Sequence, residues 1–246
     1  MMGRLFFLAI GLMGPLAAPV VAQSKDPAVP VGRMAGGVPV VLVSIGVNYT
    51  QPGIAERLAR DGEGDIIGWD FTDSDNRPFD VGKGTAPAEH GGDATALAHL
   101  LLASGPQVRL APVRVDPANQ MSLARGLAFA GQTPARVVLL TINGPAREHW
   151  EIFRQAAEHF ARLLIVVPAA GGSTDQPSFP SALGLPNVLA VPADEGRTEA
   201  PGFDGEVVQV APALAAAARI AARAAEEAAR LPDLDGVGLR RAMLAR

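Results

Sequence analysis

Seven short apolar runs, separated by helical patterns, constrain the fold of this chain more than any other feature of its sequence. The first, at 38–45, reads VPVVLVSI and is rich in β-branched side chains. Similar runs follow at 65–71, 108–115, 136–142, 163–167, 187–191 and 206–210. Continuous apolar runs of this kind are typical of strands that are buried on both faces, as in parallel sheets.

Helical patterns lie between these runs, at 53–59, 94–104, 122–129, 147–163 and 211–230. The alternation of strands and helices predicts a three-layer, doubly wound α/β fold, with a mainly parallel sheet that carries helices on both faces. Ligands of such folds bind outside the carboxyl ends of the strands, so functional residues are expected there.

The alanine-rich segment 211–230 is predicted to be the central helix of the domain. Its first half, up to Ala218, carries no charge and no side chain larger than leucine, so protein can surround it closely on every side. Charged residues begin at Arg219, so the second half is expected to emerge into solvent. An ordinary amphipathic surface helix is the alternative.

The beginning of the chain has the pattern of a secretory signal. Residues 1–22 combine a basic Arg4 with an apolar run and a small residue, Ala22, at the expected cleavage position. The segment 23–37 is rich in proline and glycine and is predicted to be a linker, followed by one domain at 38–246. The protein is therefore expected to be secreted or periplasmic, without a membrane span after cleavage; a retained membrane anchor is the alternative.

Composition excludes several functional classes. The chain contains no cysteine, which excludes disulfides, cysteine nucleophiles and thiolate metal sites. Its formal net charge is -4 and no basic cluster occurs, which argues against a nucleic-acid-binding surface.

Several motifs near the predicted strand ends share an order with those of a known family. VSIGVNYTQP spans 43–52, DATALA spans 93–98, LLTINGP spans 139–145, VPAAGG spans 167–172 and VQVAP spans 208–212. Together they resemble the subtilisin-like serine peptidases, or subtilases, over nearly the whole predicted domain. The resemblance implies a subtilisin-like fold.

The same resemblance implies that the family's catalytic groups are replaced. Ser44 stands at the position of the aspartate, Asp93 at that of the histidine, Leu214 at that of the nucleophile, and Gly172 at that of the oxyanion asparagine. A serine peptidase needs a hydroxyl, an imidazole that accepts its proton and a carboxylate that orients the imidazole. We therefore expect no catalytic residue at these positions. Asp93 is instead expected to cap the helix that follows it, Leu214 to lie in the core and Ser44 to stabilise a turn.

The leading hypothesis is a peptidase-inactive domain that binds a peptide or protein partner through the remnant of the cleft. The peptide-binding candidates implied by the resemblance are Asn143, Gly144, Ala169, Ala170 and Gly171. One alternative is an active hydrolase with relocated groups, in which Ser44 or Ser173 works with a histidine. Another is a structural assembly subunit that uses the charges of 219–230 or an acidic loop.

No cofactor or metal site is predicted with a recognised ligand spacing. The four histidines, His90, His99, His149 and His159, do not form such a pattern, and the last two lie ten positions apart on a predicted helix. Calcium could bind near Asp70, Asp73 and Asp75, as loops in subtilases often do, but the spacing differs from that of an EF-hand and a solvated loop is the alternative.

Overall fold

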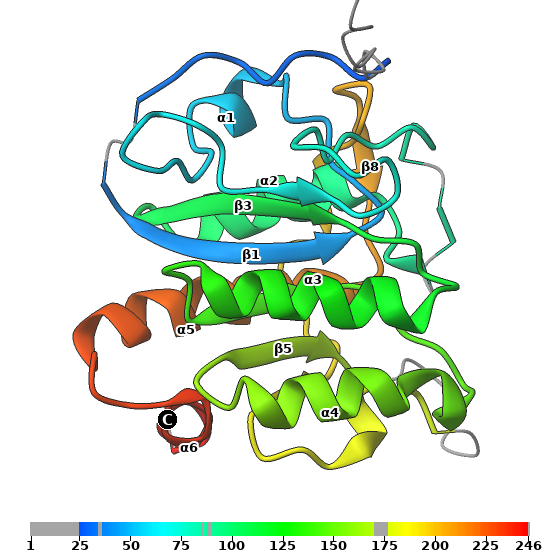
Figure 1. Ribbon diagram of the computed structural model, residues 1–246, viewed down its shortest axis with the longest axis vertical. Helices are drawn as coiled ribbons and strands as arrows, with labels where there is room; N and C mark the ends of the chain where they lie inside the picture. Colours follow the sequence, from blue (N-terminus) through cyan, green and yellow to red (C-terminus); the bar gives the residue numbers. More distant parts are fainter. Residues whose placement is uncertain (1–24, 34–35, 85, 88–89, 170–176, 246) are drawn as a thin grey trace, which may run out of the picture.

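A six-stranded parallel sheet forms the centre of the protein. The computed structural model describes residues 25–33, 36–84, 86–87, 90–169 and 177–245. The strand order is β2-β3-β1-β4-β5-β6, and every neighbouring pair in it is parallel (Figure 1). The strands are β1 Val38–Ser44, β2 Trp69–Asp70, β3 Val108–Arg114, β4 Val137–Leu140, β5 Leu164–Pro168 and β6 Val188–Val191. The predicted α/β class and parallel sheet are confirmed.

Helices cover both faces of this sheet. They are α1 Pro52–Ala55, α2 Ala94–Ser104, α3 Gln120–Gln132, α4 Glu151–His159, α5 Pro212–Arg230 and α6 Gly236–Leu244, with short 3-10 turns η2 Arg147–Trp150 and η3 Ser181–Leu183. Figure 1 shows α3 and α4 in front of the sheet and α5 behind it. Along β1, Val40 and Leu42 face the core beneath α2 and α5, whereas Val41 and Val43 face the core beneath α3 and α4.

Helix α5 occupies the central position that its sequence predicts. Leu214 and the alanines at 215–218 are buried, and the helix packs against α2 and against five of the strands. Small side chains allow this close approach on several sides. The second half is only partly solvent-exposed: Arg223 and Arg230 are exposed, but Glu227 is 4% exposed.

Two predicted strands need correction. The run 206–210 does not join the parallel sheet; β8, Val207–Gln209, pairs antiparallel with β7, Glu199–Pro201, in a separate hairpin. Val207 and Gln209 are exposed there, so this run is not buried on both faces. The run 65–71 shortens to the two-residue edge strand β2. Strand β7 and helix α6 were not predicted.

The part of the predicted linker that the structure describes lies against the domain. Tyr49 Oη donates to the carbonyl of Pro27 at 2.6 Å, and Arg77 Nη1 donates to the carbonyl of Asp26 at 2.9 Å. Val29 packs against the core beneath α2 and α5. Residues 1–22, the predicted signal, lie outside the described residues. Within the described residues, no helix has the length and apolar character that crossing a membrane requires.

Arginine side chains satisfy the carbonyls at the carboxyl ends of three helices. Arg57 donates to the carbonyls of Leu102 and Val108 around the end of α2, at 2.6 and 2.8 Å. Arg162 donates to carbonyls at the end of α3, and Arg136 donates to carbonyls at the end of α5. The last carbonyls of a helix lack partners within it and favour a nearby cation, so these contacts fix where the helices end.

Replacing Arg57 by alanine is expected to lower the free energy of unfolding by about 2 kcal/mol, the typical cost of losing hydrogen bonds to a charged group. Chemical denaturation followed by circular dichroism measures the change. Arg125→Ala, an exposed arginine on α3, is the control and is expected to change stability by less than about 0.5 kcal/mol. Equal stabilities of the two variants would contradict this role of Arg57.

Candidate functional site

The carboxyl end of the sheet brings several predicted site residues together. Strand β1 lies between β3 and β4, so the chain order reverses direction at β1. Such a switch point is where open parallel sheets form their binding crevices. Ser44 ends β1, Asn143 and Gly144 follow β4, and Ala169 follows β5.

Ser44 is buried and serves the turn after β1. Its side chain is 0% exposed, and its Oγ accepts a hydrogen bond from the Gly46 amide at 3.2 Å. Gly46 has φ +114°, and a Cβ there would lie 2.6 Å from the carbonyl of Phe79, so this turn requires glycine. The predicted turn role of Ser44 is confirmed.

Asp93 caps helix α2, as predicted. Its Oδ1 accepts from the amide of Ala96 at 3.0 Å, and its Oδ2 accepts from the amide of Phe203 at 3.0 Å. The second bond links α2 to the loop between β7 and β8, a partner that the sequence did not indicate. Both carboxylate oxygens are thus engaged with backbone groups.

Asp93→Ala is expected to destabilise the protein by about 1 to 2 kcal/mol, because it removes a helix cap and a bond to the β7–β8 loop. Asp93→Asn separates the two bonds, since asparagine caps helices about as well as aspartate but its amide nitrogen cannot accept from the Phe203 amide. Thermal unfolding of both variants measures the two contributions, and Asp93→Asn should lose less stability than Asp93→Ala. An asparagine variant that is as unstable as the alanine variant would contradict the capping role.

Leu214 belongs to the core at the start of α5. It is 3% exposed, and it lines a cavity of about 390 Å³ together with Asp93, Gly92 and Val210. Two of the three positions that the resemblance assigns to a catalytic triad therefore meet at this cavity. Ser44 does not line it.

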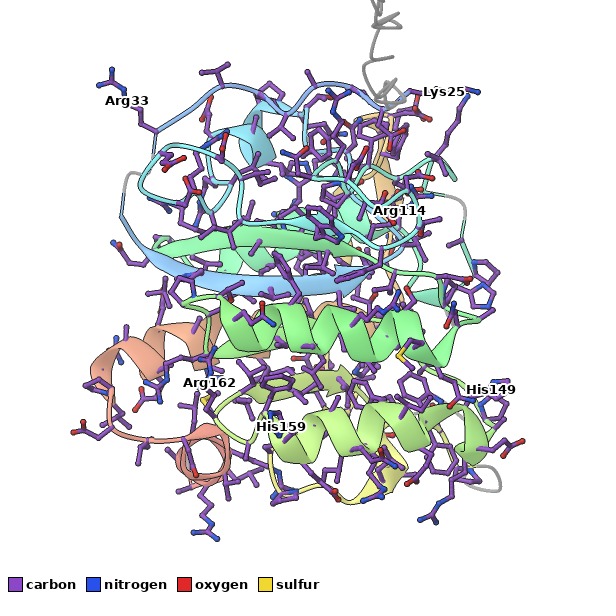
Figure 2. The ribbon with its side chains drawn as sticks, in the orientation of Figure 1. Lys25, Arg33, Arg114, His149, His159 and Arg162 are labelled. Atoms are coloured by element: carbon purple, nitrogen blue, oxygen red, sulfur yellow. The ribbon has the colours of Figure 1, made fainter. Side chains whose placement is uncertain are left out.

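The histidines are not paired with a hydroxyl in the part of the chain that the structure describes. His99 Nε2 lies 2.6 Å from Gln51 Oε1, and burial lowers the pKa of His99, against a smaller opposing effect of Asp93. Figure 2 shows His149 and His159 near opposite ends of the segment formed by η2 and α4. No serine or threonine hydroxyl among the described residues is hydrogen-bonded to an imidazole, which is the arrangement that nucleophilic catalysis requires.

A second cavity, here called the histidine cavity, lies beside the segment that follows β4. It has a volume of about 370 Å³ and is lined by Asn143 and Gly144, by Gln120 at the start of α3, and by His90 and His149. Asn143 and Gly144 were predicted from the sequence as binding residues, whereas neither histidine was. Their positions in the sequence could have indicated a site, because each histidine lies in a loop or turn close to a predicted strand end or helix start.

The backbone of Gly144 already has partners within the chain. Its amide donates to the carbonyl of Phe179 at 3.0 Å, and its carbonyl accepts from the Phe179 amide at 2.8 Å. The amide of Ala169 donates to Val191 at 2.7 Å. The other predicted positions, Ala170, Gly171, Gly172 and Ser173, lie outside the described residues. Within the described part, Asn143 and Gly144 are the candidates that line a cavity together.

The acidic loop near β2 is organised around an arginine. Arg114 Nη1 lies 2.7 Å from Asp70 Oδ2, 2.8 Å from Asp73 Oδ2 and 4.0 Å from Asp26 Oδ2. Burial raises the pKa of Asp26, and Arg114 opposes this increase. Oxygens of these three aspartates come within 4.8 Å of one another. A calcium ion there would have to compete with the Arg114 guanidinium, while Asp75 instead accepts from the Arg77 amide at 2.8 Å.

Comparisons with known proteins identify the fold. No protein-family model matches the sequence, and no curated protein sequence matches it. Among solved structures, a cold adapted subtilisin-like serine proteinase is similar over 88% of this chain and 84% of its own, with 16% identity and a TM-score of 0.59. The self-cleaved protease domain of PatA is similar over 83% and 86%, with 15% identity and a TM-score of 0.59.

Fervidolysin from Fervidobacterium pennivorans, a keratinolytic enzyme related to subtilisin, is a third similar structure. The match covers 82% of this chain and 37% of that one, with 18% identity and a TM-score of 0.61. Similarity at these identities establishes the fold and leaves activity to be argued from the site. The chain has the α/β fold of the subtilisin-like serine proteases.

Proposed function

We propose that this chain is a secreted or periplasmic protein that binds an extended peptide segment of a partner through the carboxyl end of its sheet and does not cleave it. The observation that carries the proposal is the use of the triad-equivalent positions for folding. Ser44 holds a turn, both oxygens of Asp93 accept backbone hydrogen bonds, and Leu214 is buried. The pattern of residues 1–22 supports export.

The histidine cavity supports the binding part of the proposal. Pockets that bind side chains are concave, mainly apolar and supplied with a few polar groups. Here Leu123 and Trp150 provide apolar surface, and Asn143 and Gln120 provide amides. Because the Gly144 backbone is already paired with Phe179, recognition would depend on this cavity more than on main-chain pairing at Gly144.

A substitution that fills the cavity tests the proposal. A Cβ at Gly144 would lie 3.8 Å from Trp150 Nε1, an ordinary contact, so Gly144→Val is expected to fold and to occupy part of the cavity. The probe is a pool of acetylated, amidated hexapeptides of random neutral sequence, passed over immobilised protein and quantified by mass spectrometry. The wild type should retain peptides. The Gly144→Val variant should retain about one tenth of that amount or less, which corresponds to a loss of about 1.4 kcal/mol in binding free energy.

Ala190→Val is the matched control, because Ala190 is exposed on β6. It introduces the same side chain away from the cavity and should retain peptides as the wild type does. No retention by the wild type, or equal retention by Gly144→Val, would contradict the proposal. Cleaved peptides in the flow-through would contradict the proposal that the protein does not cleave the peptide that it binds.

Two of the features suggested for a structural subunit, Arg219 and the acidic loop, have partners within the chain. Arg219 forms an ion pair with Asp194 and donates to the carbonyl of Arg197, and the acidic loop surrounds Arg114. These contacts favour peptide binding over assembly through Arg219 or the acidic loop.

A further inference from the structure

Two imidazoles line the histidine cavity from different parts of the chain. His90 lies in the loop that leads into α2, and His149 lies in η2, just before α4. Both side chains are exposed, so solvent protons and a ligand can reach them. The fold thus places two titratable groups at one cavity that are far apart in the sequence.

Apart from these imidazoles, the described part of the cavity lining carries no formal charge. Among the described residues, the other lining side chains are apolar or, at Gln120 and Asn143, uncharged amides. Histidine is the side chain whose charge ordinarily changes between about pH 5 and 8. Among the described residues, no carboxylate lines this cavity to neutralise a protonated imidazole.

The charged groups on the surrounding elements lie outside the cavity lining. Near His90 in the sequence, the Asp93 carboxylate accepts hydrogen bonds from the amides of Ala96 and Phe203. Before α3, Asp116 Oδ1 accepts the amide of Ala118.

The charged groups next to His149 have opposite signs. Arg147 and Glu148 are its exposed neighbours in η2. On α4, Glu151 pairs with Arg154 at 2.6 Å. None of these charged groups lines the cavity, so among the described residues the two imidazoles are its ionisable lining groups.

We propose that the histidine cavity selects an acidic side chain of the bound peptide and holds it more tightly when the two imidazoles are protonated. This inference rests on the proposed peptide-binding function. A carboxylate accepts hydrogen bonds from protonated imidazoles, and such charge-assisted bonds are stronger than neutral ones. A neutral amide of the same shape gains nothing from protonation of the histidines.

The test compares two peptide pools on the immobilised full chain at pH 7.5 and pH 5.5. Both pools are acetylated, amidated hexapeptides with random neutral residues, and they differ only in a fixed third residue, glutamate in one pool and glutamine in the other. At pH 5.5 the ratio of retained glutamate to glutamine peptides should rise by about threefold to tenfold over its value at pH 7.5, the range expected for two solvent-exposed charge pairs.

Two histidine variants show where the effect arises. The double variant His90→Gln, His149→Gln should abolish the pH-dependent change in ratio. His159→Gln should leave it intact, because Figure 2 shows His159 away from His149, towards the other end of α4. A change in ratio that survives in the double variant would overturn the proposal.

The remaining outcomes separate this inference from the function on which it rests. Equal retention of both pools at both pH values would overturn the acidic preference and leave peptide binding intact. If neither pool is retained above the level of the Gly144→Val variant, both the acidic preference and the proposed peptide binding are wrong. If the glutamine pool binds as well as the glutamate pool once its carboxyl terminus is left free, the cavity recognises a chain end, and the proposed side-chain preference is wrong.

Discussion

Replacing Arg114 by methionine is expected to lower the free energy of unfolding by about 3 to 5 kcal/mol, the cost typical of removing one partner from a buried ion pair. The Arg114 side chain is 9% exposed and that of Asp70 is 0% exposed, with 2.7 Å between Nη1 and Oδ2. Without the guanidinium, Asp70 stays buried close to Asp73 and Asp26. Urea unfolding followed by far-ultraviolet circular dichroism measures the loss.

Arg154→Met is the matched control for this variant. Arg154 also contacts two carboxylates, Glu151 and Glu158, each at 2.6 Å, but these side chains are well exposed to solvent. Exposed ion pairs contribute about 0 to 1 kcal/mol, so the control should lose no more than that. If Arg114→Met proves as stable as Arg154→Met, the acidic loop does not depend on the buried cation.

Leu214→Ser, which places a hydroxyl where the resemblance puts the nucleophile, is expected to destabilise the protein by about 3 to 5 kcal/mol. Leucine-to-alanine changes in cores cost about 2 to 5 kcal/mol, and serine adds a polar group to the same site. The variant should gain no peptidase activity, because Asp93 has both oxygens engaged and supplies no imidazole. Thermal unfolding and hydrolysis of fluorescent casein measure the two effects.

Leu214→Met nearly conserves volume and should cost less than about 1.5 kcal/mol. Similar stabilities of the serine and methionine variants would show that position 214 contributes little to the core. Casein hydrolysis by Leu214→Ser would contradict the assignment of Asp93 to helix capping alone.

The sequence predicted those parts of the fold that local patterns determine. Helix α2 spans the predicted 94–104, because Asp93 provides a strong cap and an apolar pattern follows it. The strand at 206–210 was placed in the wrong sheet, because a short apolar run does not reveal which strand it pairs with. The edge strand β2 is shorter than its run, since only Trp69 and Asp70 align with β3.

The site was harder to predict because its groups come together only through tertiary structure. The cap at Asp93 and the burial of Leu214 followed from neighbouring residues, whereas the bond from Phe203 to Asp93 joins distant segments. His90 and His149 share a cavity for the same reason. Arg114 gathers Asp26 from a segment predicted to be a linker, and composition alone gives no sign of that contact.

Labelling with a fluorophosphonate tests most directly the claim that this fold binds without cleaving, because the reagent modifies serines activated as nucleophiles. The purified protein should show no more labelling than its heat-denatured form, while a subtilisin-like protease in the same mixture is labelled. Mass spectrometry then covers every serine, including Ser173, which lies outside the described residues. A fluorophosphonate adduct on Ser44, Ser173 or any other serine of the native protein would contradict the account.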